Sequence, residues 1–281
     1  MAARQIIRIA QAHPMSRNDA FTAFSINDQN LGSDIDPFLQ LDHFFMKQPT
    51  FPAHPHAGFS AVTYLFEDSE GSFFNRDSQG DSSLIHPGDL HWTQAGRGII
   101  HEETPTKPGQ LCHGVQIFVN LSAANKFTFP QAFHINAADI PIFSTPEQGR
   151  VRVVVGSAFG LSSPLTEILT PVTLLDVSLS AHTTIIHEID AEQNAFVLVI
   201  QGQGSFGVPG RSLHVHQAGL CERTNSGLQV QTTDQSVQYL LCAGLPLSEP
   251  IYAQGPFVMN SAEQIQQVYA DYKSGKMGHL V

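Results

Sequence analysis

Short apolar runs separated by turn-forming residues recur along the whole chain. Val, Ile, Phe and Thr dominate these runs, and turn formers such as Pro87-Gly88-Asp89 stand between them. The runs cover residues 59–67, 82–86, 89–94, 97–103, 112–121, 150–156, 171–180, 182–189, 194–208, 212–216, 227–233 and 236–244. Short runs of β-branched and aromatic residues between turn signals are typical of sandwiches and barrels. The pattern therefore predicts an all-β protein.

Residues 129–149 interrupt this pattern with three prolines, Pro130, Pro141 and Pro146. Proline fixes φ and cannot donate to a sheet ladder, so this segment is expected to connect two units. The chain has 281 residues, which exceeds a single average domain, and the runs on the two sides have similar total length. We therefore divide the chain into two β units, residues 1–135 and 136–281. Their similar patterns suggest a duplicated fold.

One clear helix is predicted near the C-terminal end, within the stretch SAEQIQQVYADYKSG. Ser261 and Gln264 have the spacing of a capping box. Four apolar side chains follow at the i, i+3, i+4 and i+7 positions of one face: Ile265, Val268, Tyr269 and Tyr272. The helix is expected to pack on a sheet and to take no part in chemistry.

Charge narrows the possible partners. The chain carries 14 Lys and Arg against 25 Asp and Glu, for a net charge of -11. A negative field of this size repels a phosphate backbone and an anionic membrane surface, so direct nucleic-acid binding and membrane binding are not expected. Hydrophobic residues make up 42% of the chain, enough to form a large core.

The cysteines and the N-terminal residues bear on the compartment. Cys112, Cys221 and Cys242 are widely spaced and form no CxxC pair, which suits reduced, buried thiols better than a disulfide framework. The first residues contain no apolar core of signal-peptide length, and no later window approaches the ~18 apolar residues of a membrane span. A cytoplasmic protein is expected, or a nuclear one in a eukaryotic cell.

Histidine is the residue type that suggests chemistry. The chain has 14 histidines, so a single H-x-H pair carries little weight, and there are two, His54/His56 and His214/His216. The first pair stands out because an H-x-E pair, His101 and Glu103, follows in the same β unit. The second pair has no such companion.

Strand geometry gives the first pair a meaning. Residues i and i+2 of a strand share one face, so His54 and His56 can point together, as can His101 and Glu103, while Glu102 points away. On neighbouring strands of a barrel, three imidazoles and one carboxylate would converge on one point. That ligand set suits a divalent first-row metal with open positions. Spacing alone leaves the alternative open, namely surface or core histidines without a metal.

Several longer stretches resemble the pirin family of bicupins. They are HPHAGFSAVTY (54–64), RDSQG (76–80), HPGDLHWTQAGRGIIHEE (86–103) and LPLSEPIYAQGPFVMNSAEQIQQVYADYKSGKMG (245–278). The resemblance implies two stacked cupin barrels, a metal in the first barrel and none in the second. It also implies that the metal ligands are His54, His56, His101 and Glu103. Ala57 and Ser60 stand where HPHRGFE of the family has Arg and Glu, and Asn75 stands where the family commonly has His before x-Asp-Ser.

The resemblance also implies what the site does. Fe(II) is the expected metal, and cupins also accept Mn, Ni, Cu or Zn. The function we favour is a quercetin 2,3-dioxygenase-type oxygenase that takes a flavonol or similar enolic aromatic substrate and O₂, with Glu103 as catalytic proton acceptor. One alternative is an iron-dependent redox-sensing transcriptional co-regulator, or a modulator of a metabolic enzyme, that acts through a protein partner. The other alternative is a structural metal with no open position.

Overall fold

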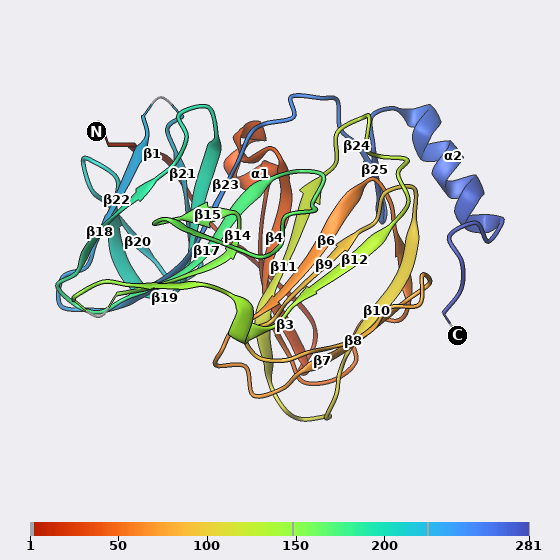
Figure 1. Ribbon diagram of the computed structural model, residues 1–281, viewed down its shortest axis with the longest axis horizontal. Coiled ribbons are helices and arrows are strands. Elements are labelled where there is room, and N and C mark those ends of the chain that lie inside the picture. The colour runs from red at the N-terminus through yellow and green to blue at the C-terminus, as the bar shows by residue number, and fades with distance from the viewer. Residues whose placement is uncertain (1–2, 148, 224, 281) are drawn as a thin grey trace.

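Two β-barrels lie side by side in the computed structural model, which describes residues 3–147, 149–223 and 225–280 (Figure 1). The prediction of an all-β chain is confirmed. Strands of the first half build most of one barrel, and strands of the second half build most of the other. None of the helices in these residue ranges has the length and apolar character needed to cross a membrane.

A seven-stranded and a four-stranded sheet form the first barrel. The larger sheet has the order β12-β9-β6-β11-β4-β3-β2, with β2 at His13–Asn18, β3 at Phe21–Asn27, β4 at Phe38–Met46, β6 at Phe59–Leu65, β9 at Leu90–Gln94, β11 at Cys112–Asn120 and β12 at Gln131–Ile135. The smaller sheet has the order β5-β10-β7-β8, with β5 at His54–His56, β7 at Phe73–Asp77, β8 at Ser82–Ile85 and β10 at Ile99–Pro105. All these strand pairs are antiparallel.

A ten-stranded sheet forms the second barrel. Its main path is β1-β21-β19-β23-β17-β14-β13, and β18, β20 and β22 complete it. The strands are β1 at Ile6–Gln11, β13 at Ile142–Ser144, β14 at Arg150–Val155, β17 at Val172–Leu179, β18 at Thr184–Glu188, β19 at Asn194–Phe206, β20 at Arg211–His214, β21 at Gln217–Cys221, β22 at Gly227–Gln231 and β23 at Val237–Gly244.

Two small hairpins and short helices complete the chain. The hairpins are β15 (Ser157–Ala158) with β16 (Leu161–Ser162), and β24 (Tyr252–Gln254) with β25 (Phe257–Met259). The helical elements are α1 (Asp28–Leu31), η1 (Ser33–Ile35), η2 (Ala137–Asp139) and α2 (Ala262–Lys273).

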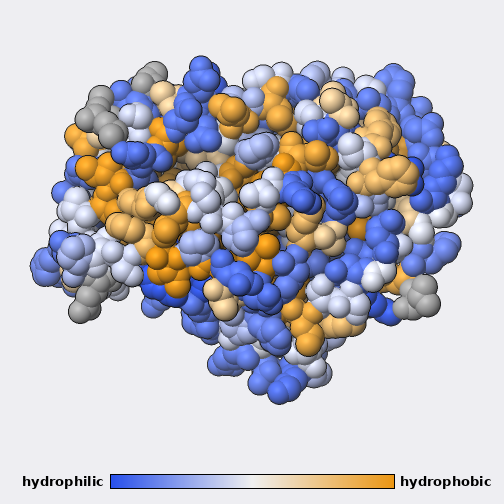
Figure 2. Space-filling model, in the orientation of Figure 1, coloured by the Kyte–Doolittle hydropathy of each residue, from blue (hydrophilic) through white to orange (hydrophobic). Residues whose placement is uncertain are grey.

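Helix α2 follows the prediction in its position and in part of its apolar face, because Tyr272 is exposed. The Ser261 side chain accepts a hydrogen bond from the Gln264 N–H, as a capping residue should. The Gln264 side chain reaches the N–H of Asn260 rather than that of Ser261, so the second half of the expected capping box is shifted by one residue. Ile265 and Val268 are buried beneath the helix, and its outward face is hydrophilic (Figure 2).

Each end of the chain packs on the barrel that is built mainly from the other half of the chain. Strand β1 pairs with β21 of the second barrel, from Ile6 opposite Cys221 to Gln11 opposite Gln217. At the other end, Ala57 forms a bridge with Phe257 of β25, and α2 covers this part of the first barrel (Figure 1). In the middle of the chain, where the sheet changes between β12 and β13, we keep the boundary as a proposal.

Strand β6 is buried along its whole length, although its sequence alternates as a half-exposed strand would. Its inner face looks into the first barrel. On the other face, Val62 and Tyr64 join an apolar cluster that also contains Val154 and Phe196 of the second barrel. The Tyr64 hydroxyl donates to Asp176 Oδ2 across this contact, at 2.8 Å. The second barrel therefore supplies the cover that makes β6 a two-sided core strand.

Candidate metal centre

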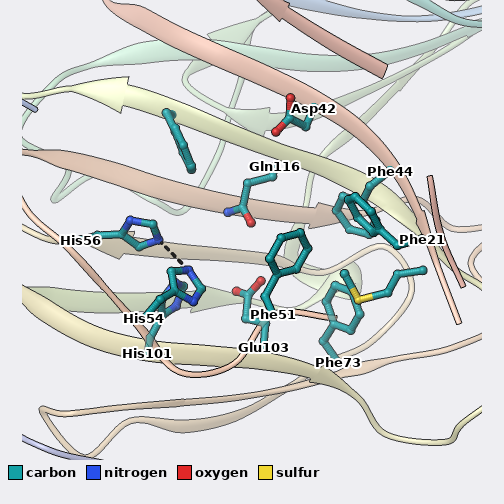
Figure 3. A pocket seen from close by; sticks show the side chains of 12 residues that line it. Phe21, Asp42, Phe44, Phe51, His54, His56, Phe73, His101, Glu103 and Gln116 are labelled. Atoms are coloured by element: carbon teal, nitrogen blue, oxygen red, sulfur yellow. Dashed lines mark hydrogen bonds between the residues drawn. The ribbon is translucent and has the colours of Figure 1, made fainter. Parts of the chain in front are cut away.

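Pairing of the short strand β5 with β10 assembles the histidines. In this antiparallel pair His101 lies opposite His54, and Ile99 lies opposite His56. His54 and His56 are two residues apart on β5 and share a face, so all three imidazoles meet on the inner side of the barrel, as expected from the spacing. Figure 3 shows the three rings turned toward one another.

The imidazole nitrogens are close enough to share an ion. One nitrogen from each of His54, His56 and His101 lies within 4.8 Å of the others, the one group of this kind in the described residues. His54 Nδ1 lies 2.9 Å from the Pro52 carbonyl and must donate to it, because a carbonyl only accepts. His54 Nε2 therefore carries a lone pair, and it points at His56 Nε2, 3.1 Å away.

Burial favours the uncharged form of two of these rings, His56 and His101. It lowers the pKa of His56 to about 3; His54 acts in the same direction, and the backbone of Pro256 opposes the shift. The pKa of His101 also lies well below its ordinary value, because of burial and then because of His56 and His54. Neutral imidazole is the form that binds metals. Three rings with converging nitrogens, two of them with lowered pKa values, fit a divalent cation better than they fit protons.

Glu103 lines the same pocket but lies apart from the nitrogen cluster. Its carboxylate oxygens do not belong to the group of mutually close donors, and Oε2 accepts a 2.6 Å hydrogen bond from the Thr63 hydroxyl. The side chain of Gln116 donates in turn to Thr63 Oγ1, at 3.3 Å. Burial raises the pKa of Glu103 to about 7, against the opposing effect of Thr63. Glu103 is thus a half-buried, oriented carboxylate that can hold or accept a proton near neutral pH.

The rest of the pocket wall is mainly aromatic, and Asp42, Met46 and Gln116 complete the lining. The cavity has a volume of about 140 Å³. Its phenylalanines gather beside Glu103 in Figure 3: Phe21, Phe44, Phe51 and Phe73, with Phe118 also in the lining. A mainly apolar cavity with a few polar groups is typical of sites for small aromatic ligands.

The C-terminal segment holds the histidine strand in place. Gly58 has φ +84, and a Cβ built there would lie 1.8 Å from the Val258 carbonyl oxygen, so only glycine allows the two backbones to approach this closely. The buried Lys126 ammonium donates to the carbonyls of Gly58 and Val258, at 2.8 and 3.0 Å, and to Asn120 Oδ1 at 2.7 Å. His56 therefore sits two residues from a tightly clamped turn.

The three departures from the family pattern take separate places. Ala57 is fully buried in an apolar cluster with Phe257 of the C-terminal segment. Ser60 is buried on the face of β6 that points away from the pocket, and no hydrogen bond to its hydroxyl is present among the described residues. Asn75 lies opposite Glu103 in the β7–β10 pair and donates to Asp81 at 2.7 Å. Asn75 is therefore the departure that pairs with a predicted ligand across the sheet.

Thr63 and Gln116 were not predicted from the sequence. Both are polar residues within strands that are otherwise mostly apolar, and both fall on the inner face of their strand. That signal is present in the sequence, but it requires knowing which face of each strand looks inward.

In the second barrel the histidines have other surroundings. His187 is buried, and its Nε2 pairs with the Tyr239 hydroxyl. His182 and His214 are exposed, and His216 stacks on Phe24 of the first barrel with ring centroids 3.5 Å apart.

Two β-barrels in tandem with a histidine-lined pocket inside the first define this chain as a bicupin with a candidate metal centre. A family profile described as Pirin matches residues 7–119, and one described as Pirin C-terminal cupin domain matches residues 174–278. The chain belongs to the pirin family, which confirms the resemblance and the cupin fold drawn from the sequence.

Relatives and solved structures agree with this assignment. A pirin-like protein of Solanum lycopersicum is 34% identical over 279 residues, which cover 98% of this chain and 93% of the relative. The structure of a quercetin 2,3-dioxygenase from Acinetobacter baumannii matches with a TM-score of 0.90 and 26% identity, covering 100% of both chains. The bacterial pirin YhhW of Escherichia coli, solved in complex with nickel(II), matches in fold with a TM-score of 0.66 and 16% identity over 85% of this chain and 98% of its own.

Proposed function

We propose that this pirin is a metal-dependent oxygenase of the quercetin 2,3-dioxygenase type, acting on a flavonol or a similar enolic aromatic compound with O₂. One observation carries the proposal: three imidazoles with converging nitrogens and a half-buried carboxylate line one pocket whose other walls are mainly phenylalanine. The likeness to a quercetin 2,3-dioxygenase over the full length of both chains supports the choice of substrate class.

In this proposal His54, His56 and His101 hold the metal, with Glu103 as the fourth ligand. A bound redox-active divalent metal with open positions supplies Lewis acidity toward an enolic oxygen and electron exchange with O₂. Fe(II) is the metal we propose, and imidazole and carboxylate ligands also suit Mn, Ni, Cu or Zn.

The chain's own groups position the substrate and move its proton. The phenylalanines Phe21, Phe44, Phe51 and Phe73 exclude water and receive a flat ring. Glu103, held by Thr63, accepts the proton of the enolic hydroxyl and keeps it beside the reacting ring. A carboxylate whose pKa is about 7 is matched to that proton transfer at neutral pH.

The test is oxygen uptake by metal-free protein reloaded anaerobically with Fe(II), Mn, Ni, Cu or Zn and then mixed with quercetin and O₂. The proposal predicts metal-dependent oxygen consumption together with loss of the flavonol absorbance. Glu103→Gln should retain much of the pocket's shape and lose most of this activity, whereas His214→Ala, an exposed histidine of the second barrel, should behave as wild type. No oxygen uptake with any of the five metals would overturn the proposal.

A redox-responsive binding protein is the second candidate, and one contact favours it. Ala57, next to His56, bridges to Phe257, and the Tyr269 ring of α2 packs on Phe257 with centroids 4.8 Å apart. A change at His56 can therefore reach a surface helix. This candidate predicts that a captured protein partner binds the ferrous and ferric forms with different affinity. Equal affinity for both forms, and for metal-free protein, contradicts it.

A further inference from the structure

The pocket at the histidines is too small for the substrate class proposed above. Its volume of about 140 Å³ falls below the roughly 300 Å³ at which sites for drug-sized ligands begin. A single enolic ring fits such a space, but a flavonol also has a fused benzo ring and a pendant outer ring, and the outer ring must lie elsewhere. The inference about where that outer ring binds rests on the proposed function.

A second hollow adjoins the first. We call it the inter-barrel groove; it has a volume of about 530 Å³ and lies between η1, the start of β4 and residues 246–258, with Asn194 and Arg223 contributed by the second barrel. Leu39 faces it from a bulge of β4, where this one residue intervenes between Phe38 and Gln40, the partners of adjacent residues on β11. The groove is thus built from both barrels and from the C-terminal segment.

Two side chains, His56 and Phe118, line both the pocket and the groove. Their rings lie 5.7 Å apart and form the partition between the two hollows. His56 is held by the clamped turn at Gly58 and belongs to the candidate metal site. Phe118 is only partly buried and contacts Phe59 at a centroid distance of 4.7 Å. Phe118 is therefore the part of the partition that can turn aside.

The groove changes character along its length. Next to the partition it is apolar, with Leu39, Phe59 and Val258 in one cluster. Farther out its charges are the carboxylates of Asp28, Asp34, Asp36 and Glu249, with Arg223 as the cation. Asp36 and Glu249 are engaged by backbone N–H groups of Ser248 and Ala123. This arrangement receives an apolar ring, accepts hydrogen bonds from hydroxyl groups and repels an anionic ligand.

We propose that the inter-barrel groove is the second half of the substrate site, that it takes the hydroxylated outer ring of a neutral polyphenol, and that Phe118 sets whether a ligand can span the partition. The enolic ring then lies at the histidines, and the outer ring lies between Leu39 and Val258 with its hydroxyls toward the carboxylates. A one-ring enol needs the pocket alone.

Calorimetric titration of the metal-loaded protein with quercetin and with the one-ring enol 3-hydroxypyran-4-one tests this placement. Ile251→Trp fills the groove from a position that is 47% exposed, so folding should be unaffected. It should weaken quercetin binding about tenfold or more, in line with steric discrimination in other enzyme sites, and leave binding of the pyranone unchanged. Ile142→Trp, on the exposed face of β13, is the matched control and should change neither.

Phe118 and the outer hydroxyls are tested with the same ligands. Phe118→Leu should tighten quercetin binding relative to the pyranone, and Phe118→Trp should weaken it; thermal unfolding of both variants confirms that they fold. Galangin, which lacks the outer-ring hydroxyls of quercetin, should bind to wild type more weakly than quercetin does. To Ile251→Trp the two flavonols should bind with equal affinity. The groove proposal is refuted if wild type, Ile251→Trp and both Phe118 variants bind quercetin with the same affinity. It is also refuted if wild type binds no quercetin.

Oxygen uptake by the same samples separates the two proposals. If quercetin is consumed at equal rates by wild type and Ile251→Trp, the groove inference fails and the oxygenase stands. If the groove variants weaken quercetin binding and no sample consumes quercetin, the oxygenase proposal is refuted and the groove proposal is supported.

Discussion

Substituting Gly58 by alanine should loosen the strand that carries His54 and His56. The residue has φ +84, which costs a non-glycine residue about 1–2 kcal/mol. The new Cβ would also lie 1.8 Å from the Val258 carbonyl oxygen and 2.7 Å from Met259 Sδ. The backbone of the C-terminal segment must therefore move, and overpacking of this kind adds about 1–3 kcal/mol.

Gly80 provides a matched comparison. It has φ +96, so alanine there meets the same backbone strain, yet nothing lies within 4 Å of its Cβ position. Gly80→Ala should cost only the strain of about 1–2 kcal/mol, whereas Gly58→Ala should cost about 2–5 kcal/mol in total. The difference between the two variants isolates the contact with the C-terminal segment.

Urea unfolding of both variants measures the free energies, and metal titration of both measures the consequence for the site. Gly58→Ala should be the less stable protein and should bind the metal more weakly, because its histidine strand is displaced. Equal stability of the two variants would show that the close approach of Gly58 to Val258 does not exist in solution, and the reasoning would be refuted.

Three further predictions concern other parts of the molecule. Lys126→Met removes an ammonium that donates three hydrogen bonds and should lower the free energy of unfolding by about 2–4 kcal/mol, measured by urea unfolding; a loss below about 0.5 kcal/mol, as for a surface site, contradicts this. Thr63→Val removes the hydroxyl that orients Glu103 and should weaken metal binding about tenfold by calorimetry, while Thr184→Val on the surface should not. Burial lowers the pKa of His187 to about 3. Between that pH and the pKa of histidine in the unfolded chain, the unfolded chain binds a proton that the folded chain does not, so the free energy of unfolding falls as the pH falls. His187→Gln should reduce this slope by up to about 1.4 kcal/mol per pH unit, and an unchanged slope in unfolding experiments from pH 7 to 4 refutes the prediction.

The candidate site was accessible from the sequence because its key spacing is local. Two residues apart on a strand means the same face, so His54 with His56, and His101 with Glu103, could be paired from their spacing alone. The spacing does not show that the two strands are neighbours in the sheet. The pairing of β5 with β10 in the structure shows this. The position of Glu103 beside the cluster, bonded to Thr63, was not accessible, because it depends on side-chain contacts between β6 and β10.

Other features depend on contacts between residues far apart in the sequence. Strand β1 belongs to the second barrel because Ile6 pairs with Cys221. No local sequence pattern predicts this pairing. The strands between Ile6 and Met46 were missed, since runs such as HPMSRN mix polar and apolar residues without a clear period. The burial of both faces of β6 needs the second barrel as cover. In each case tertiary packing, rather than local preference, decides the outcome.

Metal titration of metal-free protein tests the central claim most directly, namely that His54, His56, His101 and Glu103 hold a divalent ion. Calorimetry with Ni(II), and with Fe(II) under anaerobic conditions, should give a single binding site per chain in wild type and in the exposed-histidine control His214→Ala. Binding at that site should be lost in His101→Ala and in His56→Ala, with both variants still folded by circular dichroism. Undiminished binding in these two variants would contradict the account, because the ion would then lie elsewhere.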